Sequence, residues 1–184
     1  MTEEARLTET AEGLAPTSEG WFVVNVRDAV WYDDDTFGSV CHFEGMDVEF
    51  PQLGVNIRVL EPGQPNGRYH AESNQEDFLV LAGECLLLVE GQERRLKAWD
   101  FVHCAPHTQH IFVGAGEGSC VILMAGTRAS DRTIVYPVSE LALRHRAGVA
   151  KETTSPAEAY AEFDFPGPRR PGSWDKLPWS RENR

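Results

Sequence analysis

The sequence lacks closely paired cysteines, long apolar runs and any excess of basic residues. Its four cysteines form no C-x-x-C pair, which argues against a zinc ribbon or a thioredoxin-like motif. No stretch approaches the roughly 18 consecutive apolar residues of a membrane-spanning helix. The polar residues 1–6 are not followed by the apolar run of a signal peptide. We therefore expect a cytoplasmic protein without a membrane partner.

The charge balance narrows the range of partners further. The 184 residues include 29 acidic and 17 basic side chains, which gives a net charge of −12. Nucleic acids and anionic membranes repel such a chain, so we expect neither as a partner. The length favours one domain. Cys85, Cys104 and Cys120 lie within apolar segments, and we expect them to be buried thiols.

Short segments rich in aromatic and β-branched residues recur along the chain, separated by turn residues. Residues 55–60 alternate between apolar and polar with period two, which is typical of a half-buried strand. The strands expected from this pattern are residues 21–26, 29–32, 39–44, 55–60, 79–81, 86–89, 93–104, 110–114 and 120–126. So many short strands predict an antiparallel sandwich or barrel.

The two ends of the chain differ from this central part. We expect residues 1–19 to form a flexible arm and residues 20–136 to form the barrel. Residues 137–184 are expected to be a helical segment followed by an extended tail. In that segment Ser139 and Ser155 are candidate N-caps of two short helices, within residues 139–146 and 155–163.

Four potential metal ligands flank an apparent β-hairpin at residues 79–92. His70, Glu72 and Glu76 precede the hairpin, and His110 follows it. A hairpin returns the chain to its starting point, so we expect His110 to come back beside the first three residues. Imidazole nitrogen and carboxylate oxygen are the usual ligand atoms of divalent transition metals.

These residues fall on a sequence pattern that resembles the cupin superfamily. The first cupin motif, G-x5-H-x-H-x3,4-E-x6-G, matches His70, Glu76 and Gly83 in spacing, with Glu72 in place of the second His. Of the second motif, G-x5-P-x-G-x2-H-x3-N, only His110 is retained. The resemblance covers residues 54–126. It implies an all-β fold, a cupin β-barrel (an antiparallel double-stranded β-helix or jelly roll), here with short C-terminal helices.

The resemblance also implies a mononuclear metal site. Cupins usually present three His and one Glu, and the corresponding residues here are His70, Glu72, Glu76 and His110. One divalent transition metal per chain is expected, with iron, manganese, zinc, nickel and cobalt all compatible. A second possibility is a set of two His and one carboxylate, which leaves Glu72 or Glu76 as a base beside the metal.

Other residues near the motifs are candidates for catalysis or binding. Glu72, His103 and His107 are the candidate catalytic acid–base groups, and His107 is expected to adopt a positive φ at a position where cupins carry Gly. Gln75 and Gln109 are candidate substrate contacts. The aromatic residues expected to line the interior are Phe78, Trp99, Phe101 and Phe112.

Two functions from different classes follow from these features. The first is a metal-dependent enzyme acting on a small organic molecule in the barrel, with dioxygenase or isomerase chemistry favoured. Oxalate chemistry is disfavoured, because a metal site neutralised by two carboxylates attracts a dianion poorly. The alternative is a non-catalytic cupin that binds or senses a small molecule, with a structural metal or none. Because single-domain cupins generally pair through N-terminal strands, the resemblance also implies a homodimer.

Overall fold

The computed structural model describes residues 1–11, 13–45 and 47–181. Its strands are β1 (Leu7–Thr10), β2 (Gly13–Pro16), β3 (Val30–Asp34), β4 (Gly38–His42), β5 (Leu53–Leu60), β6 (Ala71–Glu72), β7 (Glu76–Ala82), β8 (Glu84–Val89), β9 (Gln92–Lys97), β10 (Phe101–Cys104), β11 (His110–Ala115), β12 (Cys120–Thr127) and β13 (Ile134–Val135). Its helices are α1 (Glu140–Arg144), α2 (Pro156–Ala159) and the 3-10 turns η1 (Trp174–Lys176) and η2 (Pro178–Arg181).

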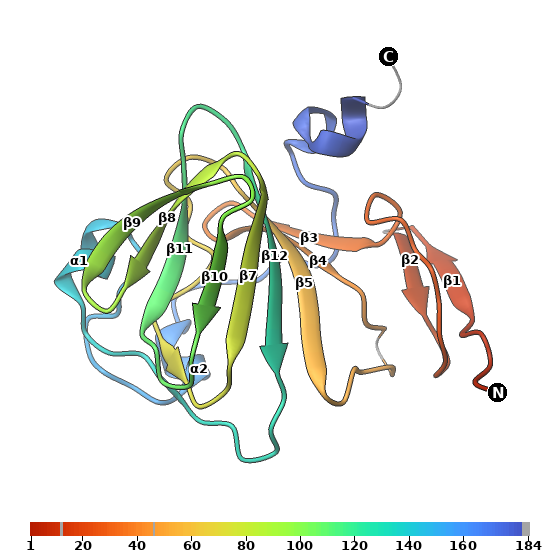
Figure 1. Ribbon diagram of the computed structural model, residues 1–184, viewed down its shortest axis with the longest axis horizontal. Coiled ribbons are helices and arrows are strands. Elements are labelled where there is room, and N and C mark those ends of the chain that lie inside the picture. The colour runs from red at the N-terminus through yellow and green to blue at the C-terminus, as the bar shows by residue number, and fades with distance from the viewer. Residues whose placement is uncertain (12, 46, 182–184) are drawn as a thin grey trace.

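The strands form two main antiparallel sheets that face each other across a common core (Figure 1). The larger sheet has the order β10-β7-β12-β5-β4-β3, and the smaller sheet has the order β11-β8-β9. Two further pairs, β13-β6 and β1-β2, complete the strands. The arrangement is the jelly roll, or double-stranded β-helix, that the sequence predicted.

Strand periodicity assigns each side chain to the inside or the outside of the barrel. The core between the sheets contains residues from both of them: Leu60, Phe78, Val80, Cys85, Leu87, Cys104, Phe112, Cys120, Ile122 and Met124. Three of the four cysteines belong to this core and all four are free and buried, which confirms the prediction for Cys85, Cys104 and Cys120. Alternate residues, such as Ile57 and Val59 of β5, belong to a second apolar cluster formed by the larger sheet and the C-terminal tail.

The C-terminal segment packs on both sides of the barrel. Helix α1 places Leu141 and Ala142 against Ile111 and Val113 of β11. Beyond α2 the tail crosses to the larger sheet, where Leu177 is 1% exposed among residues of the second cluster. Ser139 and Ser155 cap α1 and α2 through their side-chain oxygens, as the sequence predicted. No helix in the described part of the chain is both long and apolar enough to cross a membrane.

Two of the local predictions need correction. Residues 21–26 form no strand. Trp21 makes one isolated β-bridge, and the residues after it are irregular backbone that leads into a turn. The strand predicted over residues 93–104 is broken at Trp99, which has φ 75°. Residues 1–19, the predicted flexible arm, contain the β1-β2 hairpin beside the barrel (Figure 1), and the flexibility of this arm stays a prediction. The boundaries proposed near residues 19 and 136 remain predictions.

Candidate metal centre

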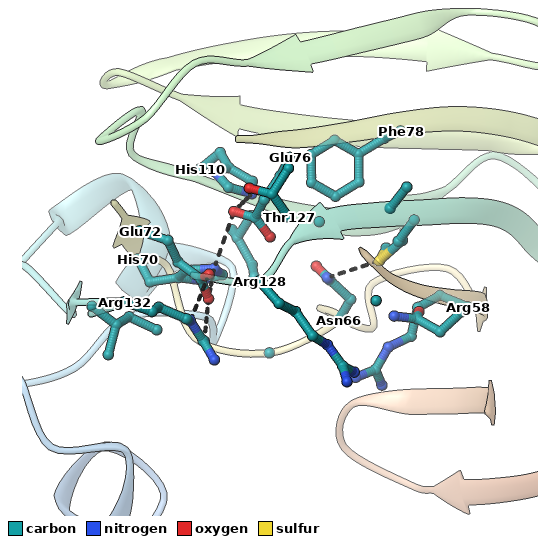
Figure 2. Close-up of a pocket in the computed structure, with 18 of the residues that line it drawn as sticks. Arg58, Asn66, His70, Glu72, Glu76, Phe78, His110, Thr127, Arg128 and Arg132 are labelled. Carbon is teal, nitrogen blue, oxygen red and sulfur yellow. Dashed lines mark hydrogen bonds and ion pairs between the residues drawn. The ribbon is translucent and has the colours of Figure 1, made fainter. Parts of the chain in front are cut away.

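A cavity of about 360 Å³ opens at the end of the barrel where β5, β7, β11 and β12 present polar side chains. Figure 2 shows most of its walls. The cavity is lined by Gly54, Asn56, Arg58, Asn66, Gly67, His70, Glu72, Glu76, Phe78, His110, Ile111, Met124, Ala125, Gly126, Thr127, Arg128, Arg132, Ile134, Tyr136 and Tyr160. A volume in this range suits a small organic molecule.

The backbone itself brings the two histidines together. His70 and His110 form an isolated antiparallel bridge, in which His110 N donates to His70 O at 2.8 Å and His70 N donates to His110 O at 3.2 Å. The imidazole ring centroids are 5.0 Å apart. The return of the chain predicted from the hairpin is therefore present, and it is fixed by main-chain hydrogen bonds.

Hydrogen bonds orient the two imidazoles for ligation. Nδ1 of His70 lies 2.7 Å from Arg68 O, and Nδ1 of His110 lies 3.0 Å from Thr108 O. A carbonyl only accepts, so each Nδ1 carries the proton and each Nε2 keeps a free lone pair. Burial, followed by the charge of His110, lowers the pKa of His70 to about 3, and burial also lowers the pKa of His110. Both rings are therefore neutral at neutral pH, as metal ligation requires.

Glu76 completes a three-residue group at the start of β7. Its Oε2 is 3.5 Å from Nε2 of His110 and 4.0 Å from Nε2 of His70. One ligand atom from each residue lies within 4.8 Å of the others. Burial, with a further contribution from the charge of Glu72, raises the pKa of Glu76 to about 7. The surroundings of Glu76 therefore make its ionised form unfavourable unless a cation binds beside it.

These separations fit a single metal ion. Ligands bound at about 2.1 Å are roughly 3.0 Å apart at a right angle and roughly 3.4 Å apart at a tetrahedral angle. The three donor atoms therefore need only small side-chain adjustments to share one ion. Two imidazoles and one carboxylate would hold the ion and would leave coordination positions free for a substrate or water.

Glu72 lies beside this group but is paired elsewhere. Its Oε1 is 3.7 Å from Nε2 of His70, while both of its oxygens accept hydrogen bonds from the guanidinium of Arg132, at 2.5 and 2.9 Å. This geometry resembles the second possibility drawn from the sequence, in which one carboxylate stays beside the metal without being one of its ligands. Figure 2 shows Arg132 approaching Glu72 on the side away from Glu76.

The other candidates lie away from the cavity. His103 is exposed on the outer face of β10, where its Nδ1 is 2.7 Å from the Asp77 carboxylate. His107 is exposed in a turn with φ 68°, so its predicted backbone conformation is confirmed, but its side chain does not line the cavity. Gln75 and Gln109 do not line it either.

The aromatic predictions divide in the same way. Phe78 and Phe112 are buried in the barrel core, as expected. Trp99 is 76% exposed and Phe101 is 64% exposed, so the prediction that they line the interior was wrong. The physical reason is the period of two: on β10, Val102 and Cys104 take the inner positions, which leaves Phe101 and His103 on the outside.

Sequence reasoning missed three arginines in the cavity. Arg58 alternates with apolar residues on β5, a pattern that predicts a half-buried strand but does not show that its polar side faces the cavity. Arg128 pairs with the Glu44 carboxylate at 2.7 and 2.8 Å. Arg128 and Arg132 follow the last long strand and lie far from both motifs in sequence, so no local pattern marks them.

Comparisons with known proteins agree with the fold. Residues 56–126 match the family model Cupin_2, described as a cupin domain. No curated protein sequence matches the chain. The polyketide cyclase RemF from Streptomyces resistomycificus is similar in structure, with a TM-score of 0.51 and 13% identity over 58% of this chain and 79% of that one.

Two further structures are similar at lower scores. One is described as a sugar phosphate isomerase from a cupin superfamily, from Silicibacter pomeroyi, with a TM-score of 0.45 and 24% identity over 52% of this chain and 62% of that one. The other is described as a predicted oxalate decarboxylase from Thermotoga maritima, with a TM-score of 0.49 and 18% identity over 59% and 100%. The jelly-roll fold and the family match together show that the central strands of this chain, residues 56–126, form a cupin domain.

Proposed function

We propose that this protein binds one divalent transition metal ion through His70, Glu76 and His110 and acts on a small organic molecule in the cavity. The observation that carries the proposal is the convergence of two pre-oriented Nε2 atoms on one partly buried carboxylate. Iron, manganese, cobalt, nickel and zinc all suit this donor set. A bound ion would act as a Lewis acid towards a substrate oxygen.

The residues around the metal group support a catalytic role. Glu72 is 11% exposed, touches the cavity and is close to His70 without belonging to the three-residue group. A carboxylate in this position can take or return a proton of a substrate held beside it. Arg132 donates hydrogen bonds to both oxygens of that carboxylate and so fixes its direction. Proton transfer beside a Lewis acid is the chemistry that isomerases need, and we favour this class over dioxygenases.

The alternative function is a non-catalytic cupin that binds or senses a small molecule. The same cavity and the same metal group would serve it, with the ion positioning a ligand instead of activating it. Turnover distinguishes the two functions, since a sensing protein leaves its ligand unchanged.

The first test is elemental analysis of the purified protein by plasma mass spectrometry. We expect about one transition metal per chain in the wild type, and loss of that metal in the His70→Ala, Glu76→Ala double variant. Glu117→Gln, on an exposed turn, is the control and should keep the metal. A double variant that is folded by circular dichroism but retains the metal would contradict the proposal. So would a wild type that binds no metal after reconstitution.

We also propose that the chain forms a homodimer and is located in the cytoplasm. Trp99 and Phe101, both more than half exposed on one edge of the larger sheet, are the kind of apolar surface that a second copy covers. The four free cysteines suit a reducing compartment. Light scattering that gives a concentration-independent mass near 20.5 kDa would contradict the dimer.

A further inference from the structure

One cation in the cavity, Arg58, has no partner among the residues that the structure describes. The side chain of Arg58 forms no hydrogen bond or ion pair with any residue in the described part of the chain, whereas Arg128 and Arg132 each hold a carboxylate. Arg58 nevertheless lies on β5 in the middle of the larger sheet, with β4 on one side and β12 on the other. An unpaired guanidinium in such a place is unusual, because partly removing a charge from water is unfavourable unless a counter-charge compensates it.

The surroundings of Arg58 do not supply that counter-charge. Asp34 is the acidic residue whose charge acts on Arg58, but the two form no ion pair, and Asp34 Oδ1 accepts the backbone N–H groups of Thr36 and Phe37 at 2.8 and 2.7 Å. Burial lowers the pKa of Arg58, yet a guanidinium stays protonated in proteins. The cation is therefore permanent.

A second uncommitted polar side chain lies next to Arg58 on the same face of the strand. Asn56, two residues earlier on β5, also lines the cavity, and its Oδ1 is buried without a hydrogen-bond partner. A buried amide oxygen left unpaired costs free energy, and a ligand hydroxyl or N–H group that donates to it relieves that cost. Asn56 and Arg58 thus form a polar wall. Figure 2 shows Arg58 across the cavity from His70, Glu72 and Glu76.

The charge balance of the cavity favours an anion. Arg132 neutralises Glu72, and Arg128 is neutralised by Glu44. With a divalent ion bound, Glu76 cancels only one of its two charges, so both the metal end and the Arg58 end are positive. The expectation that a site neutralised by two carboxylates attracts a dianion poorly depended on Glu72 being unpaired, and the Arg132–Glu72 pair removes that premise.

We propose that Arg58 binds the carboxylate or phosphate group of an organic anion whose other end reaches the metal. The inference rests on the proposed function, since it names the class of substrate for the same cavity. A guanidinium offers two parallel N–H donors that match either anion. Arg58 would therefore select the substrate and set its orientation, while the chemistry takes place at the opposite end of the cavity.

The test compares matched acids and amides on manganese-loaded protein by ligand-observed proton NMR. Benzoate with benzamide, succinate with succinamide, and inorganic phosphate by competition are the probes. We expect the acids to bind, the amides not to bind, and the proton signals of bound acids to be broadened by the paramagnetic ion. Arg58→Gln should weaken acid binding about 10- to 100-fold, as expected for loss of a charge-assisted hydrogen-bonded pair. Competition by phosphate then shows which anion the site prefers.

Controls separate this inference from the metal proposal. Arg94→Gln makes the same change of charge on the exposed strand β9 and should leave binding unchanged. Metal content should be equal in the wild type and Arg58→Gln, because Arg58 is not a ligand. If Arg58→Gln does not fold, Arg58→Lys keeps the charge without the two-pronged geometry and should bind acids with intermediate strength.

Each outcome is decisive. Acids and amides that bind equally, or no binding of any probe, would overturn the inference and leave the metal site standing. Full binding of acids by a metal-loaded Arg58→Gln protein would overturn it as well. Arg58-dependent binding of acids by a protein that takes up no metal would overturn the proposed function while supporting the anion subsite.

Discussion

Replacing Glu76 by Gln should make the metal-free protein more stable and the metal site weaker. Burial raises the pKa of Glu76 from its ordinary value of 4.5 to about 7, and its side chain is only 18% exposed. At about 1.4 kcal/mol per pH unit, keeping this carboxylate ionised in the folded state costs on the order of 3 kcal/mol above pH 7. Gln has the same shape and no charge, so the variant escapes this cost.

The sign and the pH window follow from the direction of the shift. A carboxyl group whose pKa is raised by folding lowers stability increasingly from pH 4.5 to pH 7, and by a constant amount above that. With a chelator at pH 8, Glu76→Gln should therefore melt higher than the wild type, by about 5–10 °C for a chain of this length. At pH 4 the two proteins should melt together.

Metal binding should respond in the opposite direction. Residues that only support metal ligands typically contribute about 10- to 100-fold to affinity, so loss of a ligand should cost about 100-fold or more in a chelator-competition titration with zinc. Glu117→Gln removes one negative charge from an exposed turn and controls for the general effect of net charge. A metal-free Glu76→Gln protein that melts at or below the wild type at pH 8 would refute the account of Glu76 as a strained, buried charge.

Three further predictions concern the same site and the tail. Arg132→Gln should free Glu72, whose Oε1 is 3.7 Å from Nε2 of His70, to approach the metal. We expect zinc to bind about tenfold more tightly to this variant. Unchanged or weaker zinc binding would contradict the role given to Arg132. Zinc affinity of the wild type should fall about tenfold per pH unit below pH 7, because Glu76 must lose one proton while both histidines are already neutral. Calorimetry in two buffers would measure the released proton. A zinc affinity that does not change with pH would contradict this prediction. Leu177→Ala should lower the free energy of unfolding, measured in urea, by about 2–5 kcal/mol, because this residue is only 1% exposed. A change below about 1 kcal/mol would show that the tail does not pack stably on the sheet.

The sequence identified the metal group because its members lie in local motifs joined by a hairpin. His70 and Glu76 precede the hairpin, and His110 follows it, so strand pairing alone brings them together. The arginines of the cavity were not predicted, because no local motif marks them. Arg58 lies on a strand that the sequence marks only as half-buried, and Arg132 is 60 positions away from its partner Glu72. Which face of a strand points inward depends on the closed barrel, and period two alone does not specify it.

The segment that corresponds to the second cupin motif contains few of the motif's residues. At the motif's two glycine positions, however, its backbone has the positive φ that glycine usually adopts. Trp99 and His107 stand at its two glycine positions, with φ 75° and 68°. Each is the third residue of a turn closed by a hydrogen bond, from Asp100 N to Lys97 O and from Thr108 N to Ala105 O. In a turn of type II this position requires positive φ, which is why Gly is usual there. A motif search therefore finds little, although the turn that delivers His110 is intact.

Trp99 gives a last prediction, because its side chain contributes little to the isolated fold. A left-handed conformation costs a residue with a Cβ about 1–2 kcal/mol, and an indole that is 76% exposed recovers little of this by burial. Trp99→Gly should therefore raise the unfolding free energy of the monomer by about 0.5–1 kcal/mol in urea, after allowance for the greater backbone entropy of Gly. Trp99→Ala keeps the strain and serves as the control.

The effect of Trp99→Gly on the free energy of unfolding should also depend on protein concentration if Trp99 lies in a dimer interface. If a second copy covers Trp99, the glycine variant should gain stability at low protein concentration and lose its advantage where the wild type dimerises. Sedimentation of both proteins over the same concentration range would show whether the variant dissociates first. A glycine variant that is less stable than Trp99→Ala at every concentration would mean that the turn does not strain the backbone of Trp99, and the retained φ would then need another explanation.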